Sequence, residues 1–122
     1  MALTKARTSM NAATSMVAAA ADVTGASQDL TASYGAELSV KLTNGATGPT
    51  IAAQVQIQVA NDAAGTLWSN FGGPLVGLIT NNGISQWLIE LPFAAGAVRL
   101  ISGSNTGQNV TLDADISKVT AI

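Results

Sequence analysis

Residues 51–59 read Ile-Ala-Ala-Gln-Val-Gln-Ile-Gln-Val, and this stretch decides the fold. Apolar residues at positions 51, 53, 55, 57 and 59 alternate with glutamines at positions 54, 56 and 58. Successive side chains of a β-strand point to opposite faces, so this alternation predicts a strand with one apolar face and one polar, uncharged face.

The same alternation recurs in segments that are separated by turn-forming residues. Residues 37–42, 84–91 and 110–117 alternate clearly, and residues 28–31, 66–71 and 97–101 are further candidate strands. Asn, Asp, Gly and Pro mark the turns at residues 44–49, 61–65 and 103–107. About seven to eight short antiparallel strands predict an all-β protein, a single β-sandwich or jelly roll with an N-terminal arm.

The arm is expected to cover residues 1–26 and the sandwich domain residues 27–122. An alanine-rich run follows Lys5 and Arg7, but Asn11, Thr14 and Ser15 interrupt it, which argues against a signal peptide. A mobile arm or a short alanine-rich helix is the expected structure of this segment, and a further strand within the arm is an alternative. No apolar run reaches the roughly 20 residues that a membrane-spanning helix needs.

Charge is scarce in this chain. Only 12 of the 122 residues are charged, 37 are uncharged Ser, Thr, Asn or Gln, and the net charge is −2. An average protein is about 25% charged. A polar but nearly neutral surface is inexpensive to dehydrate, so we expect neighbouring subunits to cover part of it. The five basic residues form no dense block, which disfavours nucleic acid as a partner.

The residues that usually perform catalysis are also scarce. The chain has no histidine and no cysteine, and it contains no nucleophile elbow, nucleotide fingerprint or zinc spacing. Asp113 and Asp115 share a strand face but are expected to solvate an edge strand, and Asp62 fits a turn. We therefore expect no enzyme activity, no catalytic residues, no metal site and no cofactor.

The two tryptophans are predicted to anchor the core. Trp87 lies on the same face of its predicted strand as Ile89 and Leu91. Trp68 lies in the strand that is expected to pair with residues 51–59. The alternative, an exposed aromatic platform that stacks on sugars, is less favoured because a tryptophan on the inner face of a sandwich is normally packing.

Contact residues are predicted in two places. The loop from Gly72 to Gly83 has four large aliphatic residues and no charge, which is unusual for a solvent-exposed connection. Leu88 falls on the wetter face of its strand. The predicted contact residues are Lys5, Arg7, Met10, Met16 and Val17 in the arm, Leu75, Val76, Leu78 and Ile79 in the loop, and Leu88.

Three stretches resemble the small β-sandwich proteins of tailed-phage virions: VQIQVANDAAGTLWSNF from residue 55, GISQWLIELPF from residue 83, and GAVRLISGSNTGQNVTLDADI from residue 96. Among these, the chain is most similar to capsid cement, or decoration, proteins. The resemblance implies a protein made in the host cytoplasm and carried on the capsid surface of the virion. It would clamp neighbouring major capsid protein subunits and bind copies of itself, as a dimer or a trimer, without nucleic acid or membrane as a partner.

Two alternatives stay open at this stage. One is a module of the tail or baseplate, with carbohydrate as a candidate ligand. The other is an exported pilin-like or surface-layer subunit, which would be cleaved near Ala21.

Overall fold

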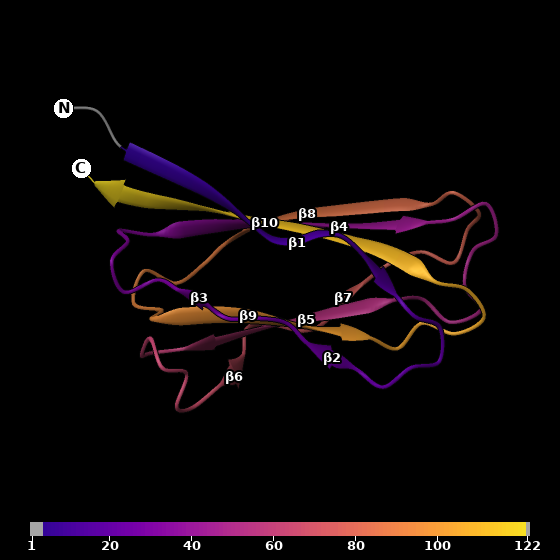
Figure 1. The fold of residues 1–122 in the computed structure, drawn as a ribbon, viewed down its shortest axis with the longest axis horizontal. Coiled ribbons are helices and arrows are strands. Elements are labelled where there is room, and N and C mark those ends of the chain that lie inside the picture. Colours follow the sequence, from indigo (N-terminus) through magenta and orange to yellow (C-terminus); the bar gives the residue numbers. More distant parts are fainter. Residues whose placement is uncertain (1–3, 122) are drawn as a thin grey trace.

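The computed structural model describes residues 4–121, and for residues 11–14 the backbone alone. Within this part of the chain the regular elements are all β-strands, and they form two antiparallel sheets that face each other (Figure 1). The predicted all-β sandwich is confirmed.

The first sheet has four strands in the order β1 (Thr4–Met16), β10 (Val110–Ala121), β4 (Ala36–Asn44) and β8 (Ile84–Glu90). The inner pair is regular, since β10 and β4 stay in register from Val110 opposite Asn44 to Lys118 opposite Ala36. Both strands alternate apolar and polar residues over their paired length, and this pattern fixes which side faces inward.

The second sheet is built on β5 (Gln54–Ala60) and β9 (Ala97–Gly103), which pair along their whole length. Short strands of two residues lie beside them. β2 (Val23–Thr24) and β3 (Gln28–Asp29) pair with β9, while β6 (Ser69–Asn70) and β7 (Leu75–Val76) pair with β5. These four short pieces explain why the described residues form more strands than the predicted seven to eight.

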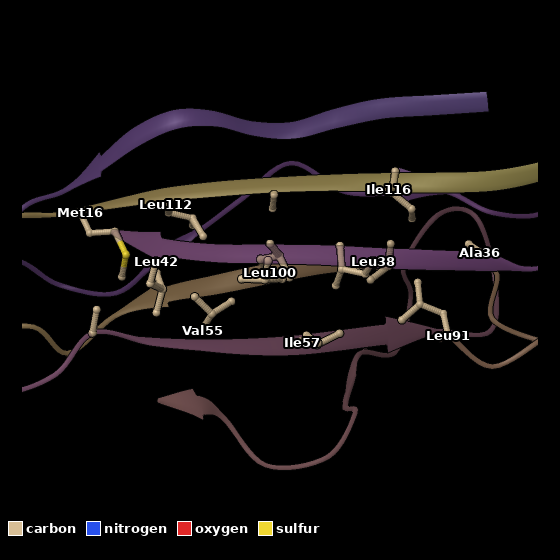
Figure 2. Packing of buried hydrophobic residues seen from close by; sticks show 14 of the residues in the cluster. Met16, Ala36, Leu38, Leu42, Val55, Ile57, Leu91, Leu100, Leu112 and Ile116 are labelled. Atoms are coloured by element: carbon tan, nitrogen blue, oxygen red, sulfur yellow. The ribbon is translucent and has the colours of Figure 1, made fainter. Parts of the chain in front are cut away.

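The core lies between the two sheets (Figure 2). Its centre is a layer of aliphatic side chains that are at most 2% exposed: Leu38, Val40 and Leu42 of β4, Leu112, Ala114 and Ile116 of β10, and Val55, Ile57, Val98 and Leu100 of β5 and β9. These are the apolar positions of the alternating segments. The predicted inward position of Ile51 is wrong, because β5 begins three residues later and Ile51 makes only an isolated bridge to Thr106 on the surface.

Residues 4–16 differ from their predicted structure. They form neither a helix nor a mobile arm, but the strand β1, which pairs with β10. β10 is three residues longer than β4 and pairs with it along one side only. The backbone N–H and C=O groups on the other side of β10 can therefore form hydrogen bonds with a further extended segment, and β1 occupies that place. Register shifts between Ser9 and Asn11 and between Asn11 and Thr14 remove the alternation by which the strand could have been recognised.

The structure places the two predicted core tryptophans in different surroundings. Trp87 is partly buried and packs against the core, but Trp68 lies outside the core. Only Ser69 and Asn70 of the predicted strand pair with β5, so Trp68 belongs to the loop before them. Its ring lies against Gly65 and under the guanidinium of Arg99, whose central carbon is 4.3 Å from the ring centroid. Phe71 packs against the core from this segment instead.

The core account predicts a large difference between two leucine truncations. Leu38→Ala should lower the free energy of unfolding by about 2–5 kcal/mol, because Leu38 is fully buried between the sheets. Leu67→Ala is the matched control, since Leu67 is 74% exposed and its loss should change stability by about 0.5 kcal/mol or less. Urea titration measures both values. Equal losses for the two variants would contradict the assigned core.

Candidate functional site

The strand register brings four loops to one end of the sandwich. Met16 and Asn44 both lie opposite Val110, and Thr43 lies opposite Ile84, so residues 17, 45, 83 and 109 share that end. In the second sheet Gln54 lies opposite Gly103, which places residues 53 and 103 there too. Loops 17–22, 45–53, 72–83 and 103–109 therefore meet at the end away from the chain termini (Figure 1), and we call it the neutral end.

The name reflects the distribution of charge. Asp22 is the single charged residue in these four loops, although the chain has twelve charged residues. Most of the others lie on the strands or toward the opposite end, where the termini and loops 30–35, 61–68 and 91–96 meet. The sequence showed that one loop lacks charge. The fold shows that the four loops of an entire end of the molecule carry a single charge.

Large apolar side chains are exposed on the same end. They are between 46% and 59% exposed, and they come from three of the four loops and from the first residue of β8: Val17, Ile51, Val76, Leu78, Ile79 and Ile84. Aliphatic surface without nearby charge loses little hydration free energy when another surface covers it. The neutral end is therefore chemically suited to contact with another macromolecule.

The loop of residues 72–83 is held in place by hydrogen bonds. The side-chain amide of Asn44 donates to the carbonyl oxygens of Leu78 and Thr80, each at 2.9 Å. The backbone N–H of Gly77 donates to the Ala53 carbonyl at 2.9 Å, and the side-chain oxygen of Asn81 accepts from Gly48 at 2.9 Å. The exposed aliphatic side chains thus sit on a fixed backbone.

A second asparagine, Asn105, holds loops in place on the other side of the neutral end. Asn105, which is 2% exposed, donates to the carbonyl oxygens of Met16 and Gln108, each at 3.0 Å. The side-chain oxygen of Asn109 accepts from the backbone N–H of Ala18 at 2.8 Å. Uncharged carboxamides, rather than ion pairs, connect the loops of the neutral end.

The structure brings some of the predicted contact residues together and separates others. Val17, Val76, Leu78 and Ile79 gather at the neutral end. Leu75 is partly buried against the core, because it pairs with Val55.

The methionines of the first strand belong to the core rather than to a contact surface. Met16 is buried, and Met10 is partly buried and packs against the core. Lys5 and Arg7 lie on the part of β1 that is remote from the neutral end, opposite Val119 and Ser117. Leu88 lies in the middle of β8 and is exposed. Ile51 and Ile84 join the neutral end, although the alternation predicted an inward position for Ile51 and neither residue was among the predicted contacts.

Several of the carboxylates have structural partners. Hydrogen bonds from the hydroxyl and backbone N–H of Thr66 lower the pKa of Asp62, and the same groups of Thr31 lower the pKa of Asp29. Both are turn interactions. Arg7 forms an ion pair with Asp115, and Lys41 lies opposite Asp113 in the sheet. β10, which carries both aspartates, is an interior strand and not the predicted edge.

Two further observations concern chemistry and membranes. Among the described residues no three His, Cys, Asp or Glu side chains lie close enough together to hold a metal ion. In residues 4–121 there is also no helix of the length and apolar character needed to cross a bilayer.

No protein-family model and no curated protein sequence matches this chain. Solved structures do share its fold. A chain of infectious bursal disease virus, Gx strain, superimposes with a TM-score of 0.57 at 10% identity over 97% of this chain and 33% of the viral one. Our chain thus spans about one third of that protein.

Two other structures match over nearly their whole length. The SPBc2 prophage-derived protein YomS has a TM-score of 0.54 at 15% identity and covers 96% of both chains. A subunit of Bacillus endospore appendages, described as disulfide-linked pili, has a TM-score of 0.51 at 10% identity and covers 100% of this chain and 93% of its own. At these identities the likeness establishes the shared fold.

The hydrogen bonds of Asn44 predict that it stabilises the neutral end. Asn44→Ala should lower the free energy of unfolding by about 1–3 kcal/mol, because the carbonyl oxygens of Leu78 and Thr80 lose their donor. The control is Asn70→Ala, which removes an exposed bond between the side chains of Gln58 and Asn70 and should cost less. Chemical denaturation compares the two. A smaller loss for Asn44→Ala than for Asn70→Ala would refute this role.

Proposed function

We propose that this protein is a non-enzymatic structural protein of a phage virion, which binds the capsid exterior through its neutral end and cements neighbouring major capsid protein subunits. The observation that carries the proposal is the neutral end itself, where exposed aliphatic side chains stand on a fixed backbone with a single charge nearby. A surface of this kind favours protein contact over catalysis or nucleic-acid binding.

The fold supports a place in an assembled particle. The same sandwich occurs in infectious bursal disease virus and in a prophage-derived protein. The finer assignment, a cement protein on a capsid, rests on the three sequence stretches that resemble phage decoration proteins.

A contact of ordinary size at the neutral end would suit an attachment that is repeated many times. A standard protein interface buries about 800 Å² on each partner, which is roughly an eighth of the 6539 Å² surface of this chain. One such contact through uncharged groups has modest affinity, but a protein that holds two neighbouring capsid subunits gains a high effective concentration for the second contact. Cementing therefore does not require a strong individual interface.

The remaining exposed residues among the predicted contacts are not part of the neutral end. Lys5, Arg7 and Leu88 are exposed but lie away from the neutral end, so they would contact another part of the partner or a second copy of this chain. Deletion of residues 1–21 is a poor test of their role, because it removes β1 and the buried Met16 as well.

Two alternatives are weaker on specific grounds. A pilus held by disulfides, as described for the endospore appendages, is not available to a chain without cysteine. A sugar-binding tryptophan platform is disfavoured because Arg99 covers one face of Trp68 and Trp87 packs against the core. A position in the tail or baseplate would use the same neutral end and differs from the proposal only in the partner.

The proposal predicts that one exposed leucine controls attachment to particles. Leu78→Asp should weaken retention on purified capsids by at least about tenfold, because an unpaired carboxylate would be dehydrated in the contact. Leu67→Asp, at the opposite end, is the matched control and should attach normally. Both variants should melt within a few degrees of the original protein, since both side chains are exposed.

Density-gradient fractions of phage from the strain that encodes the chain provide the measurement. The chain should sediment with DNA-filled heads and with tailless capsids. Its presence in free tails alone would identify the tail alternative, and unaltered attachment of Leu78→Asp would exclude the neutral end as the contact.

A further inference from the structure

The edges of the two sheets differ in how they are protected. The second sheet ends in pieces of two residues, β2 and β3 on one side and β6 and β7 on the other. In the first sheet, the edge strand β1 has three register shifts and carries Lys5 and Arg7. Short strands, irregular pairing and cations are the usual means by which proteins prevent a sheet edge from pairing with another chain.

The edge formed by β8 has none of these features. Its seven residues pair with β4 without a register shift, from Thr43 opposite Ile84 to Glu37 opposite Glu90. Glu90, at the end of the strand, is its one charged residue, and it contains no proline. A regular edge of this length, with a single charge at its end, is a template for a further strand.

Burial along β8 shows that this side of the sandwich is open. The inward side chains of Trp87 and Ile89 are only partly buried, whereas the inward side chains of the adjacent strand β4 are almost all fully buried. On the outer face Leu88 is 66% exposed and Ile84 is 54% exposed. Both faces of β8 therefore leave apolar surface that an added strand and its own sheet would cover.

We propose that a second copy of this chain occupies the β8 edge, by antiparallel pairing of β8 with β8 about a twofold axis near Trp87. Charge selects the antiparallel direction. Parallel pairing would place the two Glu90 carboxylates side by side, whereas antiparallel pairing separates them by about 20 Å, six residues at roughly 3.4 Å each. The twofold contact is closed, so it gives a dimer rather than a fibre.

The register that follows from this axis is specific. Residues 84–90 of one copy lie opposite residues 90–84 of the other, so Gln86 faces Leu88 and each Glu90 faces Ile84. The two Leu88 side chains become diagonal neighbours on the outer face, within reach of each other. The result is one continuous sheet of eight strands across both copies.

The dimer also bears on the cementing of capsid subunits. This step alone rests on the proposed function. Antiparallel pairing reverses the strand direction between the copies, so their neutral ends point in opposite directions along the shared sheet. A dimer with two neutral ends facing apart can hold two separate capsid subunits. That geometry provides the bivalence that cementing requires.

The test uses the purified protein without capsids, so its outcome does not depend on the capsid proposal. Analytical ultracentrifugation over a concentration series should show a species of two 12.2 kDa chains. Leu88→Lys, which places a cation in the middle of the edge, should weaken self-association at least tenfold. Leu67→Lys, at an exposed leucine of loop 61–68 that is not part of β8, should leave the dimer intact. A monomer or trimer for the original chain, or a dimer unaffected by Leu88→Lys, would overturn the proposal.

Cysteine cross-linking tests the register and does not depend on whether Leu88→Lys folds. Since the chain has no cysteine, Gln86→Cys and Leu88→Cys each introduce a single thiol. Mild oxidation of an equal mixture should give mainly the cross-linked pair of one variant with the other, identified by mass after the two are made with different tags. Preferential cross-linking of Gln86→Cys to itself would refute the axis at Trp87.

Discussion

The packing of two apolar faces against each other is the constraint on which the rest of this structure depends. β4 and β10 carry a leucine, valine or isoleucine at nearly every second position. The buried aliphatic side chains of β5 and β9 pack against them from the other sheet. Because the side-chain period of a strand is two, a register slip of one residue would turn these faces outward. The core therefore fixes the register, and the register decides which loops meet at each end.

The neutral end is a product of that arrangement. Four loops that are distant in sequence come together there, and between them they carry one charge. Proteins often rigidify loops with ion pairs, but here the buried amides of Asn44 and Asn105 bind loop carbonyl groups. A neutral hydrogen bond of this kind orders the backbone without adding a charge that a partner would have to dehydrate. Rigidity and inexpensive burial are thus combined on one surface.

The sequence predicted the strands that alternate regularly and failed where neighbours override the local pattern. Residues 36–44 and 110–121 were recognisable because one side of each strand faces the core. β1 was not, since its pairing partner and its register shifts, rather than its own period, make it a strand. Trp68 was misplaced because residues 66–71 were expected to form a strand, whereas only Ser69 and Asn70 pair with β5 and Trp68 lies in the loop before them, beside Arg99. Leu78 and Ile79 were predicted as contact residues from the large aliphatic residues of a loop without charge, whereas Ile51 and Ile84 could be added only when the loops were seen to share one end.

Oxidative footprinting of the protein, free in solution and bound to particles, tests the central claim most directly. Hydroxyl radicals label exposed aliphatic and aromatic side chains, and mass spectrometry gives the labelling of each. The account predicts that Leu78 and Ile79 become protected on the particle, while Leu67 and Phe93, at the opposite end, stay as reactive as in the free protein. Protection of Leu67 and Phe93 with full labelling of Leu78 and Ile79 would contradict it.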